Sequence, residues 1–350
     1  HGELIVDAES SSASYLEFVE PFYEVVRGSY YEFETDLLRY GYQSPVTPAS
    51  FVDHNVVSGS RMVLKQTPVL GGYESSDYAA ERVWASARDG VSIPVSVVRR
   101  TDTPLDGSAP LLVYTYGACE ISMPVRFSIP RLSLLDRGVI YAIAHVRGGG
   151  EMGKAWYEHG KLGSKENTFT DLVDATRHLT DAGYGDPKRV AVRGGSAGGL
   201  TVGAAINLDP GRFRAAVAEV PFVDVVNTMI DETLPLTIVE WEEWGNPNIE
   251  QDYGWIRRYA PYENIVAGGY PALLITAGLN DPRVQYWEPA KWTAKLRRSP
   301  IGDRPVLLKT EMGAGHFARS GRYDVWRDEA LVLAFILGEI ADNQEVASSK

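Results

Sequence analysis

The segment Arg193–Gly199, with the sequence RGGSAGG, constrains the fold of this chain most strongly, because it places a serine between a strand and a helix. An apolar run, Val190–Val192, precedes it, and a run of small residues, Leu200–Ala205, follows it. Ser196 therefore occupies the centre of a Gly-x-Ser-x-Gly motif on a tight strand-to-helix turn. Such a turn strains the serine backbone, and the flanking glycines allow the close approach that it requires. A glycine-rich turn with an incidental serine is the alternative, and the strand and helix on either side argue against it.

The composition describes an acidic globular protein of one large or two ordinary domains. The chain has 350 residues, of which 44% are hydrophobic, and its formal net charge is −12. This charge argues against nucleic acid and anionic membrane surfaces as partners, and it suits cationic ligands better. Cys119 is the only cysteine, so no disulfide can form within the chain. Such cysteine usage fits a reducing compartment, and we expect a cytoplasmic protein.

The sequence has no apolar run long enough for a membrane span and no signal-peptide pattern at its first residues. The longest apolar run, Ala330–Leu337, is too short to span a membrane and predicts a buried helix. The first residues, His1–Leu4, include no initiator methionine and no signal-peptide pattern. We therefore expect the chain to be a fragment or a processed product.

Residues 1 to about 75 differ in character from the rest, because they are rich in aromatic and strand-forming residues. Leu37–Tyr42, Ser50–His54 and Arg61–Lys65 predict three strands, and Ser58–Ser60 predicts the turn before the third. Three short strands cannot enclose a core of their own. We therefore interpret residues 1–75 as the end of a larger β structure, and residues 76–350 as a second domain.

The second domain begins with a hairpin and continues as strands that alternate with helices. Asp89-Gly90, between the apolar runs Val83–Arg88 and Ile93–Val98, predicts the hairpin turn. Helical periodicity is clearest over Phe169–Ala182. Nearly continuous apolar strands alternating with helices predict an α/β fold, in which a mostly parallel, doubly wound sheet is covered on both faces. The predicted strands are Leu111–Tyr114, Val139–Ala144, Val190–Val192, Ala215–Ala218, Ala272–Thr276 and Val306–Lys309.

A serine nucleophile needs a base and a carboxylate that orients the base. In an α/β-hydrolase the three residues follow in the order nucleophile, acid, base. Asp281 comes just after an apolar strand, and His316 lies in a Gly-Ala-Gly-His loop after the last strand, so both fit this order. The alternatives are a turn aspartate before Pro282 and a polar surface histidine.

The negative charge that develops on the attacked carbonyl oxygen needs hydrogen-bond donors in place. The backbone N–H of Ala197 is the expected first donor. Tyr116, in the loop after Leu111–Tyr114, offers its phenol as the second, and a simply packed aromatic ring is an equal alternative. The sequence predicts no metal site and no cofactor, since its histidines are scattered. We interpret the glycine run in Arg147–Glu151 as close packing beside the active site.

Six blocks between about residue 35 and about residue 340 carry a resemblance to a known family. They are Arg131–Gly138, Arg147–Glu151, Gly194–Gly199, Val220–Val225, Glu243–Pro247 and Gln285–Trp292. On these blocks the chain closely resembles the prolyl oligopeptidase family of serine peptidases, and within it the oligopeptidase B branch. The resemblance implies a catalytic triad of Ser196, Asp281 and His316, with Tyr116 as an oxyanion donor.

The same resemblance implies cleavage after Arg or Lys. It places Glu240 and Glu242 at the pocket for the basic side chain, and a partly desolvated carboxylate can pair with a guanidinium through two hydrogen bonds. From the residues alone, a solvated acidic helix end is an equal alternative. Arg283 resembles the family arginine that holds a substrate carbonyl near the scissile bond.

The chain departs from the family pattern in two places. The loop Glu120–Arg126 lacks the acidic pair that some relatives carry for a second basic residue, so we expect a weaker preference for paired basic residues. Family members also carry a seven-bladed β-propeller that admits only short peptides. Only its last strands could lie in residues 1–75, which makes the rest of the propeller an expected partner. Cys119, three residues after Tyr116, predicts inhibition by thiol reagents through crowding of the site.

The sequence thus predicts a serine endopeptidase that hydrolyses short peptides after Arg or Lys through an acyl-enzyme. The closest alternative is a broader esterase or aminoacyl-peptidase with the same triad. A non-catalytic binding module on the hydrolase fold is the alternative from another class, and such a module would have no need to retain all three triad residues.

Overall fold

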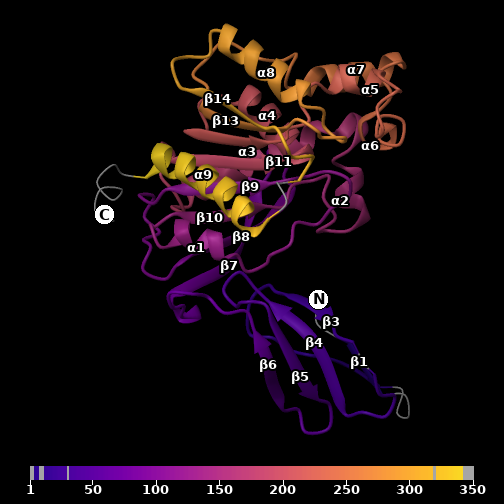
Figure 1. Ribbon diagram of the computed structural model, residues 1–350, viewed down its shortest axis with the longest axis vertical. Coiled ribbons are helices and arrows are strands. Elements are labelled where there is room, and N and C mark those ends of the chain that lie inside the picture. Colours follow the sequence, from indigo (N-terminus) through magenta and orange to yellow (C-terminus); the bar gives the residue numbers. More distant parts are fainter. Residues whose placement is uncertain (1–3, 8–11, 30, 318–320, 342–350) are drawn as a thin grey trace.

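The computed structural model of the protein describes residues 4–7, 12–29, 31–317 and 321–341. Within these residues the chain forms a large α/β body and a narrow β extension, which lies below the body in Figure 1. The body is built on an eight-stranded sheet and the extension on a four-stranded sheet, accompanied by a two-stranded pair, β1 (Leu4–Asp7) and β2 (Ser12–Tyr15).

The eight strands of the body include every strand predicted after residue 76. They are β7 (Tyr78–Ser86), β8 (Ser92–Arg100), β9 (Leu111–Thr115), β10 (Ile140–Ala144), β11 (Val190–Gly195), β12 (Ala215–Glu219), β13 (Ala272–Gly278) and β14 (Val306–Glu311). Their order across the sheet is β14-β13-β12-β11-β9-β10-β8-β7. The pairs from β14 to β10 are parallel, and β8 pairs antiparallel with β10 and β7. The predicted α/β fold is therefore confirmed, and it is the mixed sheet of an α/β-hydrolase.

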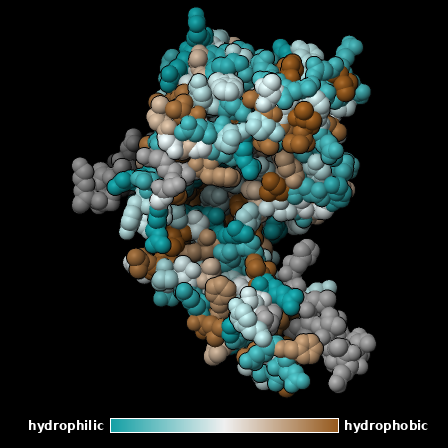
Figure 2. All heavy atoms as spheres, turned by 45° about the vertical axis from the view of Figure 1, so that its right-hand side comes forward, coloured by the Kyte–Doolittle hydropathy of each residue, from teal (hydrophilic) through white to brown (hydrophobic). Residues whose placement is uncertain are grey.

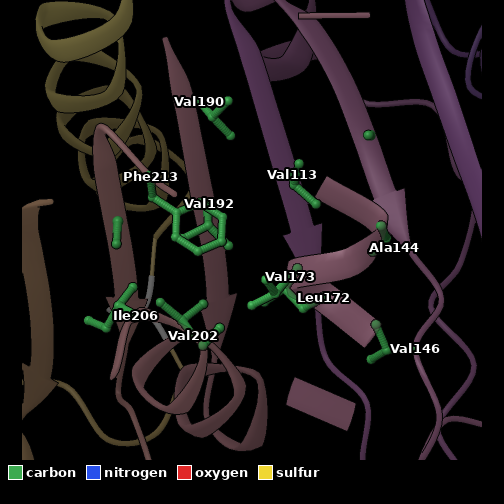
Figure 3. Packing of buried hydrophobic residues seen from close by; sticks show 14 of the residues in the cluster. Val113, Ala144, Val146, Leu172, Val173, Val190, Val192, Val202, Ile206 and Phe213 are labelled. Atoms are coloured by element: carbon green, nitrogen blue, oxygen red, sulfur yellow. The ribbon is translucent and has the colours of Figure 1, made fainter. Parts of the chain in front are cut away.

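Alternate side chains of each central strand pack on opposite faces of the sheet. In β11, Val190 and Val192 join the core on one face, where α3 (Glu166–Asp181) and α4 (Ala197–Leu208) lie (Figure 3). Ala191, between them, joins the core on the other face. Both faces are buried, which explains why these strands are continuous apolar runs rather than alternating ones. The remaining helices are α1 (Ile129–Leu135), α2 (Lys154–Glu158), α5 (Val225–Ile230), α6 (Trp241–Trp244), α7 (Glu250–Tyr259), α8 (Trp287–Arg298) and α9 (Arg322–Ile340), with short 3-10 turns at Ser75–Asp77 and Leu162–Ser164.

The run Ala330–Leu337 is helical, as predicted, but the expectation of a buried helix is wrong. It belongs to α9, which covers the sheet with one stripe only: Val332 and Ile336 are buried, whereas Leu331 is 41% exposed. A helix on the surface of a sheet needs an apolar stripe on one side, and α9 carries extra apolar residues on its outer side. No helix in the described part of the chain is long and apolar enough to cross a membrane.

The β extension is a four-stranded antiparallel sheet in the order β3-β4-β5-β6. Its strands are β3 (Glu24–Arg27), β4 (Leu37–Gln43), β5 (Ser50–Asn55) and β6 (Arg61–Gln66). The three predicted strands are confirmed, and β3 was missed because it is only four residues long. A small open sheet of this kind fits one blade of a β-propeller, and the division predicted near residue 75 falls in the connection between β6 and β7.

Apolar side chains remain exposed on this extension. Phe51, Met62 and Val63 are 53%, 59% and 60% exposed, and β6 is exposed along its whole length. Figure 2 shows hydrophobic residues between hydrophilic ones on the narrow lower part of the molecule. Blades of a propeller normally cover such surfaces on one another.

Candidate active site

Ser196 lies at the end of β11 and immediately before α4, in the position that the motif predicted. Its backbone has φ 56° and ψ −119°, a conformation that non-glycine residues rarely adopt. Backbone hydrogen bonds hold it there: its N–H donates to Glu219 O at 2.8 Å, and its carbonyl accepts from Gly199 N at 2.9 Å, Leu200 N at 3.1 Å and Phe222 N at 3.2 Å. The surrounding chain therefore maintains a strained turn that presents the hydroxyl at the carboxyl edge of the sheet.

The glycines of the motif are required by close backbone contacts. A Cβ atom added to Gly194 would collide with the carbonyl of Gly198, and one added to Gly198 would lie 2.7 Å from the carbonyl oxygen of Thr115. The start of α4 thus packs directly on the ends of β11 and β9. This confirms the close approach that the sequence predicted for these two positions.

Asp281 and His316 meet at the neighbouring strand ends. Asp281 follows β13 and His316 follows β14, and Nδ1 of the histidine lies 2.7 Å from Oδ2 of the aspartate. The Asp281 side chain is completely buried, and that of His316 is 8% exposed. A Cβ on Gly278 would collide with the carbonyl of Gly315, so the two loops pack backbone against backbone. The arrangement is that of an acid that orients a base.

Ser196 and His316 come to the same edge of the sheet but share no hydrogen bond among the described residues. Ser196 lines a cavity of about 230 Å³. His316 lines a separate cavity, between the strand ends and α9. Catalytic hydrogen bonds are often long or unformed without substrate and shorten in the reactive complex. The role of these residues as a triad stays a prediction.

Both predicted oxyanion donors lie beside Ser196. Tyr116 and Ala197 line the same cavity as the serine. Ala197 is the first residue of α4, where the N–H groups have no carbonyl to bind within the helix. Burial raises the pKa of Tyr116 far above its usual value, with further contributions from Cys119 and Glu240. The phenol is therefore protonated at neutral pH and able to donate.

The cavity beside Ser196 has apolar walls and a carboxylate. Most of its lining residues carried no recognisable chemical signal in the sequence. They are Ile121, Phe222, Thr228, Met229, Leu234, Leu236, Thr237, Trp244 and Val284. Glu240 and Arg283 supply the charges of the lining, and Cys119 supplies its thiol. A mostly apolar pocket with a few placed polar groups is typical of a ligand site.

Glu240 is the acidic residue that the fold brings to this cavity. It precedes α6, and its Oε2 accepts a hydrogen bond from Trp244 Nε1 at 2.7 Å. Burial raises the pKa of Glu240 above its ordinary value. The hydrogen bond from Trp244 and the nearby Arg283 lower it, but they do not outweigh the effect of burial. A desolvated carboxylate in an apolar pocket binds strongly to a cation that enters it.

Glu242 is not brought to the cavity, contrary to what the resemblance implied. Its side chain is exposed and it is absent from the cavity lining, whereas Glu243 is 4% exposed. Residues two apart on a helical turn face different directions, so Glu240 and Glu242 cannot both face the same pocket from α6. Glu243, three residues after Glu240, points into the protein on the pocket side.

Arg283 lies at the open side of the cavity, in the segment after Asp281. Its side chain lines the cavity, and its guanidinium lies 5.5 Å from the ring centroid of Phe317, next to His316. Its backbone N–H donates to Oδ1 of Asp281 at 2.8 Å. The backbone of Arg283 thus binds Asp281, while its side chain lines the pocket.

The glycine run after β10 packs against the loop of Tyr116, as the sequence predicted. A Cβ on Gly148 would collide with the carbonyl of Gly117, and one on Gly150 would collide with the carbonyl of Glu120. No group of three or more His, Cys, Asp or Glu side chains in the described residues could hold a metal ion.

A second serine–histidine–carboxylate arrangement lies inside the body. Ser96 Oγ is 2.7 Å from His145 Nε2, and His145 Nδ1 is 3.1 Å from Glu151 Oε1. Ser96 and His145 are 3% and 2% exposed. No substrate can reach this serine, so the arrangement is structural, and access distinguishes it from Ser196.

Known proteins resemble this chain over most of its length. A family model described as "Prolyl oligopeptidase family" matches residues 125–343. Among curated proteins, the chain is 49% identical over 337 residues to dipeptidyl aminopeptidase BI of Pseudoxanthomonas mexicana, covering 96% of this chain and 46% of the relative. It is 44% identical over 326 residues to protease 2 of Moraxella lacunata, covering 93% of this chain and 47% of the relative.

Two solved structures share the fold of this chain. Oligopeptidase B from Leishmania major superposes with a TM-score of 0.89 at 40% identity, covering 96% of this chain and 48% of that chain. Oligopeptidase B from Trypanosoma brucei with covalently bound antipain, in a closed form, superposes with a TM-score of 0.90 at 43% identity, with the same coverage. The chain therefore spans about half the length of the relatives it matches.

Proposed function

Because the chain belongs to the prolyl oligopeptidase family, we propose that it is a serine endopeptidase that hydrolyses short peptides after Arg or Lys. One observation carries the proposal: Ser196 and the partly buried carboxylate of Glu240 line the same cavity. A nucleophile beside an apolar pocket with a negative charge suits a substrate whose side chain is long and cationic.

The reaction assigns one task to each group. His316 takes the proton of the Ser196 hydroxyl as its oxygen attacks the scissile carbonyl carbon. The oxyanion accepts hydrogen bonds from the Tyr116 hydroxyl and the Ala197 N–H. The tetrahedral intermediate collapses, and His316 passes the proton to the leaving amine. Water, activated by His316, then hydrolyses the acyl-enzyme, while Asp281 holds the imidazole in the required tautomer.

Two charged side chains orient the substrate in this proposal. Glu240 pairs with the guanidinium or ammonium of the residue before the cleaved bond. Arg283, at the open side of the cavity, donates to a substrate backbone carbonyl. Because Glu240 is partly desolvated, an uncharged side chain would leave its charge without a partner, which disfavours neutral substrates.

We further propose that this chain works together with the remaining blades of a β-propeller. The exposed apolar residues of its four-stranded sheet and its coverage of only 46% and 47% of two curated relatives support this. A cytoplasmic location is proposed from the single cysteine alone.

An aminopeptidase is the second candidate, favoured by the name of the relative at 49% identity, a dipeptidyl aminopeptidase. An enzyme of that kind needs a free amino terminus two residues before the cleaved bond, whereas an endopeptidase does not. A dipeptide amide that ends in Arg, with a free or an acetylated amino terminus, therefore separates the two activities.

The test is hydrolysis of short amide substrates with Arg, Lys, Leu or Pro before the cleaved bond, with Ser196→Ala as the control. Selective cleavage after Arg and Lys, lost in the variant, supports the proposal. Ester turnover without basic selectivity would favour a broader esterase. A wild-type chain whose serine fails to react with a fluorophosphonate would instead indicate a non-catalytic module.

A further inference from the structure

A lysine is buried beneath the floor of the substrate cavity. The side chain of Lys165, at the start of α3, is completely inaccessible to solvent. Its Nζ donates to the carbonyl of Gly117 at 2.6 Å and lies 3.4 Å from Oε1 of Glu243. Burying an ammonium group costs several kcal/mol and persists only where partners compensate for the lost water. The partners of Lys165 therefore indicate what this buried charge does.

One partner of Lys165 belongs to the loop of the predicted oxyanion donor. Gly117 follows Tyr116 directly, and a Cβ on it would lie 2.5 Å from the side chains of Val146 and Thr168. The carbonyl of Tyr116 itself accepts a hydrogen bond from Thr201 Oγ1 at 2.8 Å. The carbonyls of Tyr116 and Gly117 thus each accept a hydrogen bond from a side chain, and Lys165 is the charged donor of the two. Charge-assisted hydrogen bonds are about twice as strong as neutral ones.

The other partners of Lys165 belong to the acidic turn that carries Glu240. Glu243 lies one helical turn after Glu240, and its Oε2 accepts no hydrogen bond within the described part of the chain. Lys165 Nζ also lies 4.9 Å from the ring centroid of Trp244, whose Nε1 donates to Glu240. The ammonium thus lies against Glu243 and Trp244, two residues of the turn that carries Glu240.

We propose that Lys165 is a positioning residue that joins the acidic turn Glu240–Trp244 to the loop of Tyr116. By holding the loop, Lys165 places the Tyr116 hydroxyl where it can donate to the oxyanion. By pairing with Glu243, it leaves Glu240 as the acidic side chain of this turn that presents its charge to the substrate. This inference rests on the proposed function, because it assigns Tyr116 to the oxyanion hole. The competing explanation is an ion pair that contributes to stability only.

The test uses Lys165→Met and the double variant Lys165→Met/Glu243→Gln. Methionine fills a similar volume, but it removes the cation beside the buried Glu243, so the single variant loses thermal stability. Glutamine at position 243 removes that charge, and the double variant recovers much of the melting temperature. Its Gly117 carbonyl still lacks the ammonium donor. We expect Ser196 in the double variant to react with a fluorophosphonate at least tenfold more slowly than in the wild-type protein.

A full return of the labelling rate in the double variant, together with its stability, would overturn the proposal in favour of an ion pair for stability alone. Lys188→Met, which removes an exposed lysine, is the matched control and labels at the wild-type rate.

A double-mutant cycle tests whether Lys165 acts through Tyr116. Tyr116→Phe removes the phenol donor, and loss of one oxyanion donor lowers the rate by about 10²-fold in the wild-type background. In the Lys165→Met/Glu243→Gln background the same change should cost much less, because the phenol is already misplaced. Equal costs in both backgrounds would contradict the proposal.

The fluorophosphonate readout needs no basic side chain, so it separates this inference from the proposed specificity. A wild-type serine that labels but does not cleave Arg amides contradicts the specificity alone. Normal labelling of both Lys165 variants contradicts the role of Lys165 alone. A wild-type serine that does not label overturns both.

Discussion

Both oxygens of the Asp281 carboxylate have hydrogen-bond partners, and His316 contacts only one of the two. Its Oδ2 lies 2.7 Å from His316 Nδ1, while its Oδ1 accepts the backbone N–H groups of Arg283 at 2.8 Å and Val284 at 3.0 Å. The carboxylate cannot rotate without losing these bonds. The histidine therefore presents Nε2, rather than Nδ1, to any proton that it exchanges.

Replacing this aspartate should separate activity from stability. In Asp281→Asn one oxygen can still accept the two N–H groups, so the fold should persist. An amide at the other position favours the wrong histidine tautomer, and kcat for an Arg amide should fall by about 10⁴-fold. Asp303→Asn, at an exposed site, is the control and should keep full activity. A loss of less than tenfold would argue against an acid role for Asp281.

Selectivity for basic residues should depend on Glu240 more than on Glu242. Glu240→Gln removes a charge-assisted interaction of roughly 1.5–3 kcal/mol, which corresponds to a rise of about 10- to 150-fold in KM for Arg substrates. Turnover of a Leu substrate should rise, because the variant no longer leaves a desolvated charge without a partner. Glu242→Gln should have a smaller effect, because that side chain is exposed outside the cavity. Equal rises of KM in the two variants would indicate that Glu240 and Glu242 both bind the basic side chain, as the resemblance implied.

A second basic residue in the substrate should add little. Glu120 is the one acid in the loop 120–126, and its Oε2 already lies 2.8 Å from Lys154 Nζ. Arg126 pairs with Glu24 at 2.7 Å. Exposed ion pairs contribute about 0–1 kcal/mol, so kcat/KM for an Arg-Arg substrate should exceed that for Gly-Arg by less than about fivefold. A much larger gain would reveal an acidic subsite elsewhere.

Inhibition by thiol reagents should be slow and should accelerate with pH. Cys119 is exposed and lines the cavity beside Ser196, and partial desolvation there, with Glu243 and Glu240 nearby, raises its pKa to about 12. Only a small fraction of the thiol is thiolate near neutral pH, and the thiolate is the reactive form. The rate of inactivation by N-ethylmaleimide should rise about tenfold for each pH unit between 7 and 9. Cys119→Ser should resist, and inactivation of that variant would exclude a thiol as the target.

A buried carboxyl behind the cavity should make stability depend on pH. Glu288 accepts hydrogen bonds from the N–H groups of Val223 and Asp224 and from the Thr228 hydroxyl, and burial raises its pKa to about 7. The folded state therefore keeps a proton that the unfolded state loses above its ordinary pKa of 4.5.

The stability contributed by this neutral carboxyl is fully present below pH 4.5 and is lost as the pH rises to about 7, in total roughly 3 kcal/mol. Free energies of unfolding measured from pH 4.5 to 8 should fall more steeply with pH for the wild-type protein than for Glu288→Gln. Glu250→Gln, at an exposed glutamate, should follow the wild-type slope. Parallel curves for wild type and Glu288→Gln would rule out this titration.

Much of the fold could be predicted because its signals are local. The apolar strands, the Asp89-Gly90 hairpin and the helix after Ser196 each follow from neighbouring residues, and all appear in the structure. The predicted order of serine, aspartate and histidine could be read in the same way, since each follows a recognisable strand. The expected burial of Ala330–Leu337 was wrong, because composition does not tell how many sides of a helix a sheet will cover.

The sequence by itself determined the strand-to-helix turn at Ser196 and the series of strand ends on which the site is assembled, because backbone sterics and apolar periodicity act over a few residues. Tertiary structure alone decided that Glu243 rather than Glu242 is buried beneath the pocket and that Lys165 meets it. Those two partners are 78 residues apart in the chain. Their pairing depends on how α3 and α6 pack around the Tyr116 loop, and the free energy of a buried charge is set by contacts that no single segment contains.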